Sequence, residues 1–253
     1  MRAKEEIKRY YDSLAVEKNA DIDKWLKSGD KRLVPETKCG NYFIDRKLQT
    51  SLRMARLGEK AHILEIGCQY GYFTFRLADL GFNITAVDLS ERTLEMAKKR
   101  AQHHGLTNIN FIKADAEDLH VIRDNTFDAV FSFSCLRYLP DPSKALTEIY
   151  RVLRPSGKII ADFPNKYSPW FNIIKPAMGI KPHMHDRLYS APEVKRLVSS
   201  AGFKAVKTAK ILFTPRKAPS SLLPFFKFMD FAGERIYGLR ELAAIILCRG
   251  EKQ

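Results

Sequence analysis

The chain has 253 residues, 45% of them hydrophobic, and a formal net charge of +14. This length suits one domain with a substantial core. No apolar run approaches the ~18 residues of a membrane-spanning helix, and the charged N-terminus lacks the apolar region of a signal peptide. The four cysteines lie far apart, without metal or disulfide spacing. These features argue against membrane-spanning, secreted and disulfide-stapled proteins and predict a cytoplasmic one.

The positive charge is concentrated in the last third of the chain. Residues 1–60 carry 15 basic and 10 acidic side chains, residues 61–160 carry 12 of each, and residues 161–253 carry 16 and 7. This asymmetry favours an anionic substrate, surface or partner for the C-terminal region. Charge that serves only solubility is the alternative.

The first half of the chain predicts helices that alternate with short apolar strands. Ser90 and Gly105 supply the N-cap and the C-terminal stop of one helix. The predicted elements in chain order are helix 41–57, strand 62–66, helix 71–80, strand 83–87, the helix between Ser90 and Gly105, and strand 109–112.

The second half continues this alternation and then departs from it. Asp141 and Ser190 can cap the two helices, and a proline-containing segment without a clear crossover helix joins the last two strands. The predicted elements are strand 127–133, helix 142–153, a turn at 154–157, strand 158–163, helix 191–201, strand 204–213 and strand 241–248.

Strands alternating with helices predict an α/β fold, namely a doubly wound, Rossmann-like, mostly parallel seven-stranded sheet with helices on both faces. The missing crossover predicts that the last strand is antiparallel. We expect residues 1–40 to form an N-terminal helical cap segment and residues 41–253 to form the main domain. Inserts at about 164–190 and 214–240 follow the carboxyl ends of parallel strands, so we expect them to form lids over that edge.

A glycine-bracketed turn follows the first predicted strand. The strand ends at Glu65, Gly67 and Gly71 bracket the turn, and the second strand ends at Asp88. A unit of strand, glycine turn, helix, strand and acid holds a nucleoside at the carboxyl edge of a parallel sheet. The sequence therefore predicts a nucleoside cofactor.

Several ordered motifs narrow the cofactor. They are Glu65-Ile-Gly-Cys-Gln-Tyr-Gly71, Val87-Asp-Leu-Ser90, Lys113-Ala-Asp-Ala-Glu-Asp-Leu119, Phe127-Asp-Ala-Val-Phe-Ser-Phe-Ser134 and, after Leu136-Arg-Tyr-Leu-Pro-Asp141, the segment 145–157. This series closely resembles the class I S-adenosylmethionine-dependent methyltransferases, in particular the small-molecule branch that includes quinone-biosynthesis enzymes. The resemblance covers about 60–165 and, more weakly, 185–205. It implies S-adenosyl-L-methionine as the cofactor.

The resemblance also implies which residues hold this cofactor. Asp88 accepts from the ribose hydroxyls, Asp115 from the adenine amine, and Glu65 lies near the amino group of the methionine half. Tyr11 and Arg46 are expected at the methionine end, with a solvated amphipathic N-terminal helix as the alternative. The full expected set is Glu65, Gly67, Cys68, Gln69, Gly71, Asp88, Leu89, Asp115, Ala116, Ser134, Tyr11 and Arg46.

Gln69 departs from the family pattern, which usually has glycine at this place. In a dehydrogenase that glycine lets a pyrophosphate approach, so its absence weakens a nicotinamide interpretation. It also leaves open a non-catalytic relative that only binds the cofactor.

The catalytic groups are harder to predict, because the cofactor carries the reactivity and the protein mainly aligns the acceptor. A base is needed only where the nucleophile arrives protonated. We take His183 and His185 as candidate bases and Tyr138 as a positioning group; structural hydrogen bonds are the alternative for the histidines. Because these histidines lack further obvious metal ligands, no metal site is predicted.

The predicted function is in-line methyl transfer to a small acceptor that is lipophilic or anionic, because both inserts mix basic and large apolar residues. Peripheral contact with a membrane is a further expectation. A nucleic-acid methyltransferase is the alternative. It is disfavoured because the segment 132–136, Ser-Phe-Ser-Cys-Leu, is not the Asn/Asp-Pro-Pro-Tyr motif of amino-methylating DNA enzymes.

Overall fold

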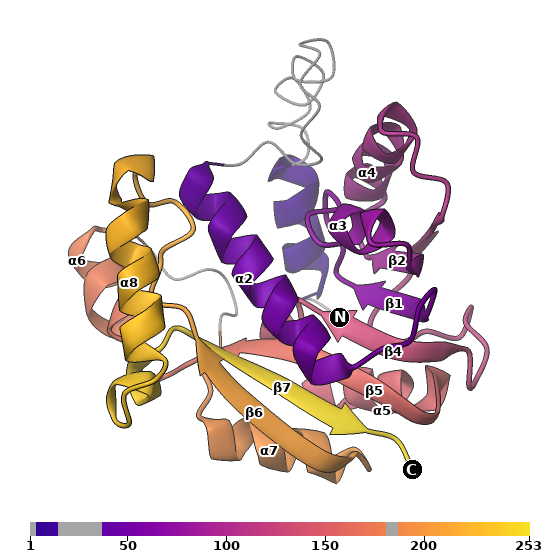
Figure 1. Ribbon diagram of the computed structural model, residues 1–253. Helices are drawn as coiled ribbons and strands as arrows, with labels where there is room; N and C mark the ends of the chain where they lie inside the picture. The colour runs from indigo at the N-terminus through magenta and orange to yellow at the C-terminus, as the bar shows by residue number, and fades with distance from the viewer. Residues whose placement is uncertain (1–3, 15–36, 181–186) are drawn as a thin grey trace.

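The computed structural model describes residues 4–14, 37–180 and 187–253 (Figure 1). Its centre is a seven-stranded sheet of order β3-β2-β1-β4-β5-β7-β6. The strands are β1 (His62–Ile66), β2 (Asn83–Asp88), β3 (Ile109–Lys113), β4 (Phe127–Ser132), β5 (Leu153–Pro164), β6 (Lys204–Ile211) and β7 (Ile245–Glu251). Strands β1 to β5 pair in parallel, and β7 is antiparallel to both β5 and β6. The predicted fold class is thereby confirmed.

Helices cover both faces of the sheet. A helix over 4–14 precedes α2 (Lys38–Ala55), α3 (Thr74–Asp79), α4 (Glu91–His103), α5 (Pro142–Val152), α6 (Lys175–Ala177), α7 (Ala191–Ser200) and α8 (Leu223–Gly233). The short turns are η1 (Leu136–Tyr138), η2 (Trp170–Ile174), η3 (Ser220–Leu222) and η4 (Leu239–Leu242). Figure 1 shows α2, α3 and α4 on one side of the sheet and α5 and α7 on the other.

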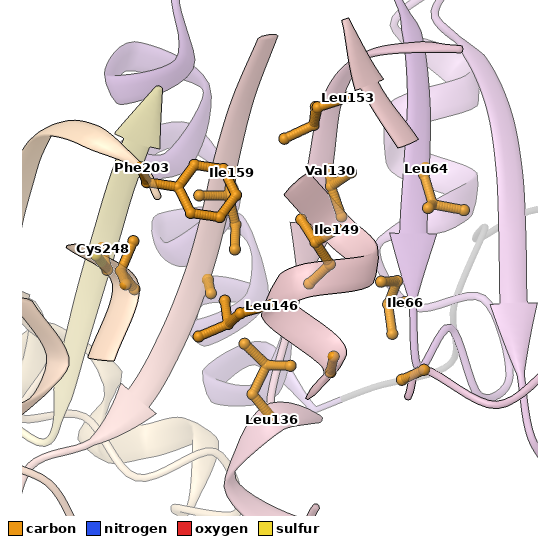
Figure 2. Close-up of a cluster of buried hydrophobic side chains, with 14 of the residues drawn as sticks. Leu64, Ile66, Val130, Leu136, Leu146, Ile149, Leu153, Ile159, Phe203 and Cys248 are labelled. Carbon is orange, nitrogen blue, oxygen red and sulfur yellow. The ribbon is translucent and has the colours of Figure 1, made fainter. Parts of the chain in front are cut away.

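Alternation along the strands gives the sheet two apolar faces. Leu64 and Ile66 of β1 pack with Leu146 and Ile149 of α5 in the cluster of Figure 2. Ile63 of the same strand belongs to the opposite cluster, with side chains from α2, α3 and α4. The carboxyl edge of the parallel strands lies between these helix layers, so the loops that follow the strands are held in place.

Three predicted helix caps are present. The side chain of Ser90 accepts from the backbone N–H of Thr93, and that of Asp141 accepts from Ser143. Ser190 and Glu193 form a reciprocal capping box.

The predicted turn at 154–157 is wrong, because this segment belongs to β5. Ser156 N–H donates to the carbonyl of Lys252 over 2.9 Å, and Lys252 N–H donates to Gly157 over 2.9 Å. The pairing register of β5 with β4 shifts between Phe127 and Ala129. The additional residues are therefore taken up as an irregularity within the strand, where Ser156 has a φ of 64°.

Both inserts leave the carboxyl edge of the sheet, after β5 and after β6. Helix α8 in the second insert was not predicted. Its apolar residues lie on all sides of the helix, so the sequence shows no amphipathic pattern. The predicted domain boundary at residue 40 falls inside α2. Among the described residues, no helix combines the length and apolar character needed to cross a bilayer.

Candidate cofactor site

The turn between β1 and α3 has the backbone geometry that its glycines predict. Gly67 and Gly71 have φ values of 76° and 83°. A Cβ on Gly67 would lie 2.7 Å from Cys135 Cβ, and one on Gly71 would lie 2.3 Å from the ring of Phe75. A Cβ at either position would clash with these neighbours, so glycine is required at both positions.

Gln69 adopts the same left-handed conformation without being glycine. Its φ is 47°, and its N–H donates to Asp88 Oδ2 over 2.9 Å. The hydrogen bond offsets part of the cost that this conformation carries for a residue with a Cβ. The loop geometry is therefore kept despite the departure from the family pattern.

Asp88 connects the two loops that follow β1 and β2. Its Oδ2 accepts from Gln69 N–H and its Oδ1 accepts from Ser90 N–H, each over 2.9 Å. Burial raises the pKa of Asp88, and the two backbone donors act against that rise. Each carboxylate oxygen has more than one acceptor site, so a ligand hydroxyl can still be bound.

These loops enclose a pocket with about 680 Å³ of space, its mouth included. Nine predicted residues line it: Tyr11, Gly67, Gln69, Asp88, Leu89, Asp115, Ala116, Ser134 and Tyr138. The wall also contains residues that were not in the predicted set: Lys4, Ile7, Lys8, Ile66, Val87, Ser90, Ala114, Cys135 and Leu139. The strand-end members among them could have been found, because each follows or ends a parallel strand at the same edge of the sheet.

The helix over 4–14 closes the pocket. Lys4 Nζ lies 2.7 Å from Asp115 Oδ2 and 2.6 Å from Glu117 Oε2. At the other end of the helix, Ser90 Oγ donates to Asp12 Oδ1 over 2.5 Å. The described residues of the two inserts do not line this pocket. Within the described parts of the chain, the helix over 4–14 and not the inserts therefore covers this pocket.

Three predicted residues lie behind the pocket wall. Glu65 is 1% exposed, and its Oε2 accepts from Thr74 Oγ1 over 2.6 Å. Burial raises the pKa of Glu65 to about 8, against the hydrogen bond from Thr74. Cys68 and Gly71 are likewise packed inside the turn, and burial raises the pKa of the Cys68 thiol. These groups shape the turn from beneath.

The structure does not bring Arg46 to the pocket. Its guanidinium pairs with Glu234, which follows α8. Tyr11 does reach the pocket, where burial raises the pKa of its hydroxyl and Tyr138 and Cys135 lie close by. His183 and His185 lie outside the described residues. Among the described residues, no cluster of His, Cys, Asp and Glu is arranged to hold a metal ion.

A buried ion pair that was not predicted stands beside the pocket wall. Lys47 Nζ lies 2.9 Å from Asp162 Oδ2, and both side chains are 1% exposed. Lys47 also donates to Ser134 Oγ over 3.2 Å, and Ser134 N–H donates to Asp162. Ser134 has a φ of 55°. The pair therefore holds a pocket residue in a conformation that side chains other than glycine rarely adopt.

Aromatic rings surround the ammonium group of this pair. Lys47 Nζ lies 5.0 Å from the ring centre of Phe73 and 5.3 Å from that of Phe133. Burial lowers the pKa of Lys47, and the field of Asp162 opposes this. The rings and the carboxylate together replace the water that the ammonium group has lost.

The pocket suits a nucleoside with an amino-acid tail. Apolar walls from three strand ends can enclose a base, and Asp88 and Asp115 present carboxylates to donor groups. Gly67 lets the loop after β1 pack closely against Cys135 in the pocket wall. The residues present therefore fit S-adenosylmethionine.

Comparison with known proteins agrees with this geometry. A family model described as a methyltransferase domain matches residues 64–161. A sterol 4-C-methyltransferase of Caenorhabditis elegans is 32% identical over 105 residues, which cover 41% of this chain and 31% of that protein. A ubiquinone biosynthesis O-methyltransferase of Colwellia psychrerythraea is 28% identical over 160 residues, which cover 60% of this chain and 65% of that protein. The chain thus spans less than two thirds of the length of these relatives.

A solved structure supports the fold. A possible histamine N-methyltransferase of Thermotoga maritima superposes with a TM-score of 0.60 at 24% identity, covering 84% of this chain and 93% of that one. Similarity at this level of identity shows the fold alone. Residues 64–161 thus match a methyltransferase domain, and the motif series and the fold of the chain resemble those of the class I S-adenosylmethionine-dependent methyltransferases.

Proposed function

We propose that this protein transfers the methyl group of S-adenosylmethionine to a small acceptor, which is lipophilic or anionic. The observation that carries the proposal is one pocket in which Gly67, Asp88 and Asp115 follow or end three neighbouring parallel strands. Methyl transfer requires little more than alignment of donor and acceptor, and a pocket with fixed walls can provide this.

The residues have separate tasks in this proposal. Asp88 binds the ribose hydroxyls, and Asp115 and the N–H of Ala116 bind the adenine. Ser134 and Cys135 lie in the pocket wall just past β4, where we place the methyl-donor end. The sulfonium of the bound cofactor supplies the electrophilic methyl group. Tyr138 remains our candidate for positioning the acceptor, and His183 and His185 remain candidate bases.

Basic side chains surround the buried Lys47 beside the pocket wall. The charges of Arg137 and Arg216 both lower the pKa of Lys47. Arg216 stacks 4.4 Å from the ring centre of Tyr72, in the turn that follows β1. An acceptor with an anionic group and an apolar body fits such a setting. The proposal places the enzyme in the cytoplasm, peripheral to a membrane.

Two measurements test the proposal. Calorimetry should show binding of S-adenosylmethionine and S-adenosylhomocysteine, and tritiated methyl from the cofactor should enter the organic phase of a cell extract. Binding of a nicotinamide dinucleotide with no response to either sulfur ligand would overturn it. Cofactor binding without transfer to organic-phase, aqueous or RNA fractions would instead identify a non-catalytic relative.

We expect Glu65, which precedes the pocket residue Ile66, to make cofactor affinity depend on pH. If its carboxylate takes the ammonium group of the methionine half, the proton that Glu65 holds below pH 8 must leave on binding. The affinity for S-adenosylhomocysteine should then rise about tenfold per pH unit from pH 6 towards pH 8, and level off as Glu65 becomes ionised. Calorimetry in two buffers with different ionisation enthalpies would count the released proton.

The matched variant is Glu65→Gln, which keeps the side-chain shape and removes the titration. Its affinity should be lower at pH 8 and nearly constant from pH 6 to pH 8. A wild-type affinity that does not change over this range would show that Glu65 does not bind the ammonium group.

A further inference from the structure

Exposed apolar side chains gather on the two inserts. Of the 15 large hydrophobic residues recorded as exposed in the described chain, 13 lie within 167–180 and 222–242. The remaining two, Leu80 and Val121, lie in other parts of the fold. A soluble surface scatters such residues singly, so their concentration on two segments calls for a partner that covers them.

Helix α8 is apolar on its outward face as well as its inward face. Phe225, Phe228 and Phe231 follow one another at intervals of three residues and are 57%, 65% and 57% exposed. On the inward side, Asp230 is buried and its carboxylate accepts from the N–H groups of Phe213 and Thr214. The inward contacts already anchor α8, so among the described residues the outward phenylalanines add little to the packing of the fold.

The first insert contributes a second apolar element. Ile173 and Met178 are 65% and 63% exposed. The neighbouring Phe171 and Tyr42 of α2 pack against the same buried cluster, and Lys227 of α8 lies 5.4 Å from the ring centre of Tyr42. Both inserts therefore have a residue near this cluster or the tyrosine beside it, and Figure 1 shows α6 and α8 at the same end of the molecule.

The charge around α8 is of one sign. Lys217, Lys227, Arg235 and Arg240 are exposed. The three acids in the same stretch are neutralised or buried: Asp230 is 1% exposed, Glu234 pairs with Arg46, and Glu241 pairs with Lys210.

Arg235 lies directly beside the exposed apolar side chains of α8. Its guanidinium carbon lies 3.9 Å from the ring centre of outward-facing Phe231. Basic groups at the margin of an apolar face match a surface with anionic headgroups above a hydrocarbon layer.

We propose that the outward face of α8, with the neighbouring residues 173–180, docks this protein on an anionic lipid bilayer. Both inserts emerge at the carboxyl edge of the sheet, where the pocket also lies. A docked protein therefore holds this edge of the sheet, with the pocket, near the bilayer. The second part of the proposal, which rests on the proposed function, is that the methyl acceptor is an amphiphile held in that bilayer.

Vesicle sedimentation tests the docking. Vesicles of phosphatidylcholine with phosphatidylserine should retain the full chain at least about tenfold better than phosphatidylcholine alone, and added salt should reduce the retention. The variant Phe225→Gln/Phe228→Gln/Phe231→Gln should lose at least about tenfold in vesicle affinity. The variant Lys217→Gln/Lys227→Gln/Arg235→Gln should lose the preference for the anionic lipid.

Matched controls separate docking from general surface effects. Leu80→Gln/Val121→Gln removes the exposed apolar residues outside the inserts, and Lys98→Gln/Lys99→Gln removes exposed charge from α4. Both should bind vesicles as the wild type does. Equal loss in the control and insert variants would overturn the proposal. The proposal would also be overturned if vesicles do not retain the wild type. If the wild type then forms a dimer in solution and the phenylalanine variant is a monomer, the apolar face binds a second copy of the chain.

Calorimetry with S-adenosylhomocysteine keeps the docking distinct from the proposed function. The phenylalanine variant should bind this ligand as the wild type does and should melt at nearly the same temperature, because the changed side chains are exposed. If the protein binds vesicles but not the cofactor, the proposed function is refuted and the docking proposal remains. If it binds the cofactor but not vesicles, the docking proposal is refuted and the proposed function remains.

Discussion

Replacing Lys47 with methionine should lower the free energy of unfolding by about 3–5 kcal/mol. The substitution fills similar space but leaves Asp162 with a charge in a site where both side chains are 1% exposed. The cost of desolvating that carboxylate then has no compensating cation, and only the donors of Ser134 remain. Urea denaturation followed by circular dichroism measures the change.

A second substitution should recover most of this loss. In Lys47→Met/Asp162→Asn the buried charge is gone, and the amide oxygen can still accept from Ser134 N–H. A neutral pair of similar volume is often no less stable than the ion pair it replaces. Lys99→Met, on the exposed side of α4, is the matched control and should change stability by less than about 0.5 kcal/mol. A single variant as stable as the wild type would mean that the pair does not organise this site.

Much of the fold could be predicted because its signals are local. Short apolar strands, caps such as Ser90 and Asp141, and glycines such as Gly67 each depend on a few neighbouring residues. The parallel pairing and the antiparallel last strand follow from chain alternation and the missing crossover. The turn at 154–157 was wrongly predicted because Arg-Pro-Ser-Gly is a turn sequence locally, whereas pairing with Lys252 keeps the segment in β5, with Ser156 at a φ of 64°.

The site was less predictable, because parts of it depend on contacts between distant segments. Lys47 and Asp162 are 115 positions apart, and nothing around Lys47 in the sequence marks it as buried. Asp162 gives a weak signal, since it is an acid between the apolar residues Ala161 and Phe163 of β5. Likewise, the pairing of Lys4 with Asp115 that closes the pocket joins two segments with no shared local pattern. Arg46 was expected at the cofactor, but its guanidinium forms an ion pair with Glu234, which lies in an insert far along the chain.

Replacing Asp88 with alanine should weaken the binding of S-adenosylhomocysteine about tenfold to several hundredfold. A charged hydrogen bond contributes roughly 1.5–3 kcal/mol, and the carboxylate is proposed to accept from two ribose hydroxyls. The structure adds a second effect, because the same oxygens accept from Gln69 and Ser90 N–H. The variant should therefore also lose stability, by about 1–3 kcal/mol, as these donors lose their acceptor. Calorimetry and thermal unfolding measure the two effects separately.

Ligand chemistry distinguishes ribose recognition from a distorted loop. The wild type should bind adenosine much more tightly than 2′,3′-dideoxyadenosine, and Asp88→Ala should bind both with similar, weak affinity. Asp88→Asn should lie between the two proteins, because the amide keeps one acceptor oxygen. Glu95→Ala removes an exposed acid from α4 and should leave all these affinities unchanged. If Asp88→Ala weakens both nucleosides by the same factor, the carboxylate only shapes the loops, and the ribose hydroxyls are bound by another group.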